Sequence, residues 1–123
     1  MNKGMIRRAL SVFIVCAAAS QAQAAVPTSW ATPTGYDVVT AVTPGIMVHG
    51  AFGNVGCPAL NVFFIPKAGN EQQYAQMVAT VMMAVATGKR IMAYVAHCAP
   101  QNWYADPAHT FGNVVGTSLH ITE

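Results

Sequence analysis

The chain has 123 residues, of which 54% are hydrophobic and only 8% are charged. Six Lys and Arg residues against four Asp and Glu residues give a formal net charge of +2. No sizeable basic cluster is present of the kind that binds a phosphate backbone, so the composition argues against a nucleic-acid partner.

The first 24 residues, 1–24, have the pattern of a secretory signal peptide. A basic stretch with Lys3, Arg7 and Arg8 precedes an uncharged, mostly apolar run, and an Ala-Gln-Ala cleavage pattern ends at Ala24. The apolar run is too short for a membrane span, which needs about 20 residues. We expect cleavage after Ala24 or one residue later, a secreted or periplasmic protein, and one domain over residues 25–123.

Removal of the signal peptide changes the charge and the cysteine content. Three basic residues then face four acidic ones, for a net charge of −1, and Cys16 is lost. Cys57 and Cys98 remain as the only pair in an oxidising compartment, which predicts a disulfide between them, with two free thiols as the alternative. Closing that loop stabilises a fold by about 4 kcal/mol in the chain-entropy model.

The elements that follow the signal peptide begin with an extended arm rich in Pro and Thr. Runs of β-branched residues predict strands over residues 36–43 and 46–52, joined by a Pro44-Gly45 turn as a hairpin. A third strand is predicted over about 60–65.

A helix is predicted after the third strand. Asn70 can act as N-cap with Gln73 as a variant of the capping box, and Glu71 suits the positive end of the helix dipole. Gly88, followed by two basic residues, marks the end. Apolar residues recur at the spacing of one helical face, which we expect to pack on the sheet. These are Tyr74, Met77, Val78, Val81 and Val85.

The opposite side of this helix is small and uncharged, whereas a helix that faces solvent normally carries Lys and Glu there. We therefore expect other copies of the chain to cover it in a homo-oligomer. The predicted interface residues are Gln72, Gln76, Ala79, Thr80, Met83 and Thr87.

A fourth strand is predicted over residues 90–97, then a loop over 99–107, and a fifth strand over 118–122. Five strands with one helix between the third and the fourth is the element order of an OB-fold, a five-stranded Greek-key barrel. The predicted fold class is therefore mainly β with one α-helix.

The segment over residues 63–98 resembles the B subunits of subtilase-cytotoxin-like and pertussis-like bacterial toxins. The resemblance rests on a Tyr-containing helix, a Thr87-Gly88 end with a basic pair, and the strand over residues 91–95. It implies an OB-type fold, a ring of five copies around a helix-lined pore, binding of host-cell glycans or glycoproteins, and carriage of a catalytic A subunit. The serine that subtilase-type B subunits use near their first strand has no counterpart in residues 34–40.

Sugar recognition needs an aromatic face for stacking and neighbouring polar groups that bind hydroxyls. Two places combine them, Tyr36 with Asp37, and Asn102 with Trp103, Tyr104 and Asp106. The alternative interpretation places the Tyr36 ring in the core and holds the other two rings in a loop clamped onto the barrel.

The residues indicate neither catalysis nor a cofactor. No nucleophile motif or phosphate loop occurs, and the four histidines lack the spacing of metal ligands. The leading hypothesis is a ring-forming toxin B-subunit-like protein, without enzyme activity of its own, that recognises a cell-surface glycan. The alternative is a standalone secreted or periplasmic OB-fold module that binds a protein partner.

Overall fold

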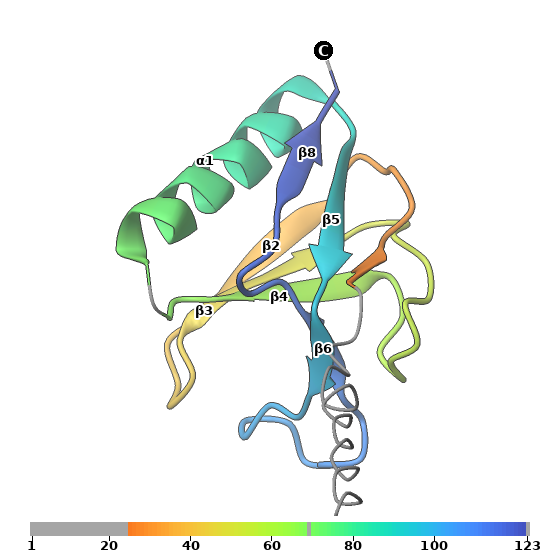
Figure 1. Ribbon diagram of the computed structural model, residues 1–123, viewed down its shortest axis with the longest axis vertical. Helices are drawn as coiled ribbons and strands as arrows, with labels where there is room; N and C mark the ends of the chain where they lie inside the picture. Colours follow the sequence, from red (N-terminus) through yellow and green to blue (C-terminus); the bar gives the residue numbers. More distant parts are fainter. Residues whose placement is uncertain (1–24, 69, 123) are drawn as a thin grey trace, which may run out of the picture.

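The computed structural model describes residues 25–68 and 70–122, so the predicted signal peptide lies outside the described residues. Within the described residues the protein is mainly β with one helix, as predicted. The strands form a three-stranded sheet of order β1-β5-β8 and a five-stranded sheet of order β2-β3-β4-β7-β6 (Figure 1). Within these residues the two sheets do not join into one closed barrel.

The larger sheet begins with the predicted hairpin, β2 (Gly35–Val39) and β3 (Gly45–His49), and continues antiparallel into β4 (Val62–Pro66). Strand β7 (Phe111–Asn113) pairs parallel with β4, and β6 (His97–Ala99) pairs antiparallel with β7. Strands β2 and β6 are therefore the two edges of this sheet.

The smaller sheet is centred on β5 (Ile91–Val95), which pairs antiparallel with β1 (Val26–Pro27) and β8 (Leu119–Ile121). Strand β5 alternates buried and half-buried residues, as expected for a strand with one face on the core. An isolated bridge between Ala31 and Ile91 ties the N-terminal arm to β5.

Three short strands were missing from the prediction, namely β1, β6 and β7. Each has only two or three residues, too few to show a periodic pattern. The single strand predicted over 90–97 is in fact β5 followed by the start of β6. At Ala96 the chain passes from one sheet to the other, and its N–H donates to the Asn113 carbonyl at 2.8 Å.

The central strands β3 and β4 are buried on both faces, which explains why their residues are apolar without alternation. On one face Val48, Phe63 and Ile65 belong to the main core cluster, which α1 covers. On the other face Met47 and Phe64 belong to a second, smaller cluster.

Helix α1 (Glu71–Thr87) has the predicted bounds because its caps are local. The Asn70 side chain accepts a hydrogen bond from the Gln73 N–H at 3.0 Å. At the other end Gly88 has a φ of 76°, and its N–H donates to the Ala84 carbonyl at 2.9 Å.

The buried face of α1 differs from the predicted one. Met77, Val81 and Ala84 are buried, whereas Val78 is only half-buried and Val85 is 38% exposed. The helix packs mainly on β4 and β8, and the small Ala84 faces the sheet in place of Val85. The prediction that Val85 packs on the sheet was therefore wrong. None of the helices in the described part of the chain has the length and apolarity needed to cross a bilayer.

A substitution at Gly45 tests how closely β3 packs against β4. A Cβ atom there would collide with the Ile65 carbonyl oxygen and lie 2.7 Å from the Phe64 ring. We expect Gly45→Ala to lower the free energy of unfolding by about 1–3 kcal/mol in urea denaturation, as overpacking does. Gly35→Ala is the control, because its Cβ would meet nothing within 4 Å. Equal stability of the two variants would contradict the packing.

The predicted disulfide between Cys57 and Cys98 is present and spans 41 residues of sequence. It links the segment before β4 to β6. Replacing both cysteines by alanine should lower the free energy of unfolding by about 4 kcal/mol, because the open chain gains conformational entropy when it unfolds. Urea denaturation of the oxidised and the alanine protein measures the difference, and a loss below about 1 kcal/mol would contradict this account.

Candidate functional site

A cluster of aromatic rings lies on the loop between β6 and β7. Tyr104 stacks on His109 with ring centroids 5.0 Å apart, and it meets Phe111 edge to face at 5.4 Å. Trp103 lies 5.8 Å from Phe111. Phe111 is buried, while Trp103 and Tyr104 are 42% and 40% exposed. The loop therefore presents two aromatic side chains to solvent that are fixed from below by a core residue.

Hydrogen bonds within the loop hold its shape. The Tyr104 N–H donates to the Gln101 carbonyl at 3.0 Å, and the Gln101 side chain is buried. The Asp106 carboxylate accepts from the Ala108 N–H at 3.0 Å, as in an Asx turn. Asn102 is exposed next to the two rings. An aromatic surface beside an exposed amide is the chemistry that sugar recognition needs.

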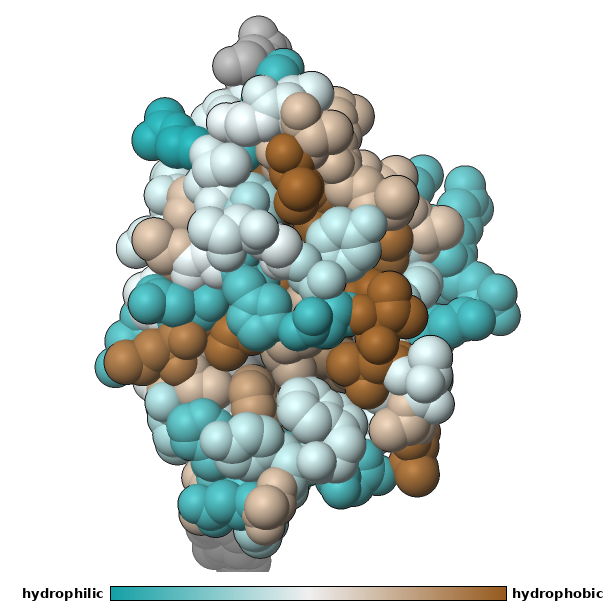
Figure 2. Space-filling view, turned by 180° about the vertical axis from the view of Figure 1, so that it is seen from behind, coloured by the Kyte–Doolittle hydropathy of each residue, from teal (hydrophilic) through white to brown (hydrophobic). Residues whose placement is uncertain are grey.

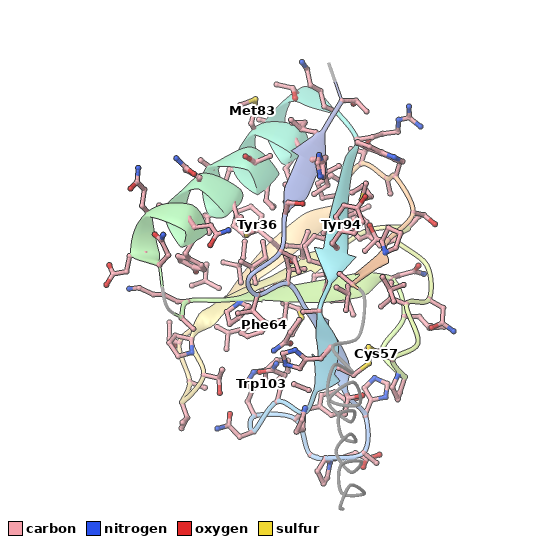
Figure 3. The ribbon with its side chains drawn as sticks, viewed as in Figure 1. Tyr36, Cys57, Phe64, Met83, Tyr94 and Trp103 are labelled. Atoms are coloured by element: carbon pink, nitrogen blue, oxygen red, sulfur yellow. A yellow bond between two sulfur atoms is a disulfide. The ribbon has the colours of Figure 1, made fainter. Side chains whose placement is uncertain are left out.

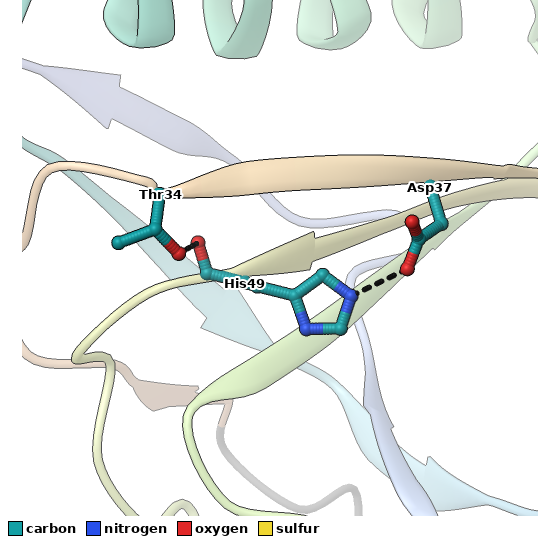
Figure 4. A network of polar contacts seen from close by, with 3 residues as sticks. All are labelled: Thr34, Asp37 and His49. Atoms are coloured by element: carbon teal, nitrogen blue, oxygen red, sulfur yellow. Dashed lines mark hydrogen bonds and ion pairs between the residues drawn. The ribbon is translucent and has the colours of Figure 1, made fainter.

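The other predicted sugar-binding pair lies on β2. Tyr36 is half-buried and packs against the main core, as the alternative interpretation expected. Asp37 is exposed, but its Oδ2 is 2.7 Å from His49 Nε2 (Figure 4). Thr34 Oγ1 donates to the His49 carbonyl at 3.3 Å. The Asp37 carboxylate is thus already engaged by a neighbouring side chain.

The structure does not bring the two predicted sugar-binding places together. Strand β2 is one edge of the five-stranded sheet, and the aromatic loop follows β6 at the other edge, with β3, β4 and β7 between them. Figure 3 shows the separation of Tyr36 from Trp103, which lies near the lower end of the molecule.

Helix α1 exposes an uncharged outer surface. Of the six predicted interface residues Thr80 is half-buried, and the exposed ones are Gln72, Gln76, Ala79, Met83 and Thr87. Thr80 Oγ1 and Thr87 Oγ1 donate to the carbonyls of Gln76 and Met83, so these hydroxyls use their hydrogens within the helix. Met82, which is not among these six residues, is 48% exposed.

Two rows of side chains flank the outermost residues of α1, which are the exposed Gln72, Ala79, Met83 and Ala86. The residues of each row follow one another at helical spacing, so each row runs along the helix. The apolar row consists of Ala75, Val78, Met82 and Val85. The polar row consists of Gln73, Gln76, Thr80 and Thr87.

A surface hollow lies beside each row. The apolar groove, of about 420 Å³, is lined by Lys67, Glu71, Tyr74, Ala75, Val78, Ala79 and Met82. Burial raises the pKa of the Tyr74 phenol above its ordinary value. The second hollow, the α1–β8 cleft, measures about 270 Å³ and is lined by Gln73, Gln76, Met77, Thr80, Thr117, Ser118 and Leu119. Sequence reasoning missed the cleft, because its two walls come from distant segments.

Three histidines each contact a different neighbouring side chain. His49 contacts Asp37, His109 stacks on Tyr104, and His120 Nε2 is 3.1 Å from Ser118 Oγ. Across residues 25–68 and 70–122 no three side chains of His, Cys, Asp or Glu come close enough to hold a metal ion together. The arrangement of these surfaces favours binding by stacking and hydrogen bonding.

The chain matches no known protein-family model and no curated protein sequence.

Proposed function

We propose that the protein is a secreted, self-assembling binding protein of the toxin B-subunit type. In this proposal copies associate through α1 into a ring of five, and each copy recognises a host glycan through the aromatic loop. The observation that carries the proposal is the exposed pair of Trp103 and Tyr104, fixed at the end of the molecule away from α1. The resemblance to toxin B subunits adds a catalytic A subunit as a further proposed partner of the ring.

The topology supports an open OB-type barrel as the fold of this module. Strands β2, β3 and β4 form an antiparallel meander, β7 returns parallel to β4, and α1 connects β4 to β5. The bridge from Ala31 to Ile91 brings the arm before β2 against β5. These are the connections that a five-stranded Greek-key barrel requires, with its strands interrupted where the chain changes sheet.

The surface of α1 supports self-assembly. From Gln72 to Thr87 the helix has no charged side chain, and Met82 and Met83 are 48% and 51% exposed. Figure 2 shows brown and tan atoms gathered at the upper right, the side that carries α1 in this turned view. Exposed apolar patches of this kind mark surfaces that bind other proteins. A second copy of the chain covers the apolar row without having to form an ion pair.

The positions of the two surfaces support their separate roles. In Figure 3 Met83 lies at the upper end of the molecule and Trp103 at the lower end, with the sheets between them. Association through α1 therefore leaves the aromatic loop free to meet a ligand. A ring of such loops binds a glycan-bearing surface at several points, which raises the overall avidity above that of one copy.

The apolar groove favours a second candidate function, a standalone module that binds a protein partner. Its walls of Tyr74, Val78 and Met82 suit an apolar side chain of another protein, and Lys67 and Glu71 supply charges beside it. Light scattering on the purified protein separates the candidates, because the standalone module is a monomer and the ring is not.

Self-assembly is tested by Met82→Glu. A charge in the centre of the apolar row would be desolvated in the assembly, so we expect the variant to be monomeric in multi-angle light scattering while the unmodified protein is oligomeric. Val42→Glu is the control, because Val42 is 84% exposed on the β2–β3 hairpin and does not line the apolar groove. A monomeric unmodified protein at high concentration would disprove assembly.

Glycan recognition is tested on a glycan array with Trp103→Ala. Loss of ring stacking should weaken binding to the best glycan about ten-fold. Trp30→Ala is the matched control, because Trp30 is 41% exposed on the N-terminal arm and should leave binding unchanged. Absence of any glycan signal for the unmodified protein, or equal losses in the two variants, would overturn the role of the loop.

A further inference from the structure

The α1–β8 cleft differs from the aromatic loop in being concave. Its one wall is the polar row of α1, and its other wall is the turn that leads into β8. Gln73 Nε2 donates to the Thr117 carbonyl at 3.3 Å, so the two walls are joined by a hydrogen bond at one end. Figure 1 shows β8 running beside α1.

The cleft is electrically neutral. None of the described residues that line it carries a charge, although the chain places Glu71 and Lys67 at the apolar groove on the other side of the same helix. Its volume of about 270 Å³ falls just below the roughly 300–1,000 Å³ of pockets for drug-sized ligands. The site therefore suits a small ligand without charge, the size of one ring.

The polar groups of the cleft complement hydroxyl groups. Thr80 Oγ1 and Thr117 Oγ1 donate their hydrogens to the carbonyls of Gln76 and Tyr94, at 2.9 and 2.6 Å. These oxygens can therefore only accept a hydrogen bond from a ligand. The exposed Gln76 carboxamide can both donate and accept. A ligand that supplies both donors and acceptors, as a hydroxyl does, can form hydrogen bonds with all of these groups.

The cleft also has an apolar component, supplied by Met77 and Leu119. A pyranose ring combines a C–H face with hydroxyls around its rim, so it matches an apolar surface ringed by amides and hydroxyls. We propose that the α1–β8 cleft binds one neutral sugar ring of a glycan, a hexose or an N-acetylhexosamine. This inference rests on the proposed glycan recognition, to which it adds a second contact.

The position of the cleft is compatible with assembly through the apolar row, but not with burial of the predicted interface residues Gln76 and Thr80, which line it. It lies along the polar row, whereas the exposed methionine and valine side chains of the apolar row lie on the other flank of α1. Association through the apolar row leaves the cleft open, and each copy then contacts a branched or extended glycan at two separate points, the loop and the cleft.

The test uses methyl glycosides of neutral hexoses and N-acetylhexosamines as probes, titrated into isotope-labelled protein at millimolar concentrations and followed by NMR. We expect one of them to shift the Gln76 side-chain amide and the Met77 methyl resonances. Gln76→Leu removes the amide at nearly the same size and should weaken the binding about 3- to 10-fold. Gln72→Leu is the matched control, because Gln72 is exposed on α1 but does not line the cleft.

The outcomes separate this inference from the proposed function. Shifts at the cleft, weakened by Gln76→Leu and kept by Gln72→Leu, support it. Shifts at Trp103 and Tyr104 alone overturn it and leave glycan recognition by the loop intact. Equal effects of the two glutamine variants, or no shifts while the glycan array is positive, overturn it as well. A negative array together with no shifts overturns both proposals.

Discussion

The contact of Met77, Val81 and Ala84 with the core beneath α1 determines how every other surface of the helix is used. A helix on a sheet can be rotated about its axis, and the rotation decides which residues it exposes. Because the small Ala84 faces the sheet, Val85 and Met82 turn outward on one flank, and Gln73, Gln76 and Thr80 turn toward β8 on the other. One packing choice thus creates both the apolar groove and the neutral cleft.

The scarcity of charge gives these surfaces their character. Surface helices of soluble proteins usually carry charged side chains, which are costly to remove from water on association, and α1 has none between Glu71 and Lys89. Its threonine hydroxyls are bonded to the helix itself, which lowers the cost of removing water from them. In the proposed assembly this surface would associate by shape and apolar area rather than by charge pairing.

The aromatic loop is held in place without regular secondary structure. Phe111 in β7 supports Trp103 and Tyr104 from below, and the disulfide at Cys98 fixes the strand from which the loop departs. Rings held in place lose little conformational entropy when they stack on a ligand. The opposite placement of α1 and the loop keeps the surface proposed for assembly apart from the surface proposed for recognition.

The features that the sequence determined by itself are those set by nearby residues. The ends of α1 follow from the Asn70 and Gly88 caps, the β2–β3 hairpin from its turn, and the disulfide from the two cysteines that lie outside the predicted signal peptide. The side chains of Trp103 and Tyr104, which were predicted to bind a sugar, are exposed. Their contact with Phe111 could not be predicted from the sequence, because the β7 strand is recognisable only through its pairing with β4 and β6. The rotation of α1 and the cleft between Gln76 and Ser118 were likewise decided by the tertiary structure alone. The physical reason is that the hydrogen bonds of caps and turns join residues close in the sequence. The rotation of α1 and the shape of the α1–β8 cleft depend instead on which side chains, far apart in the chain, fill the core together.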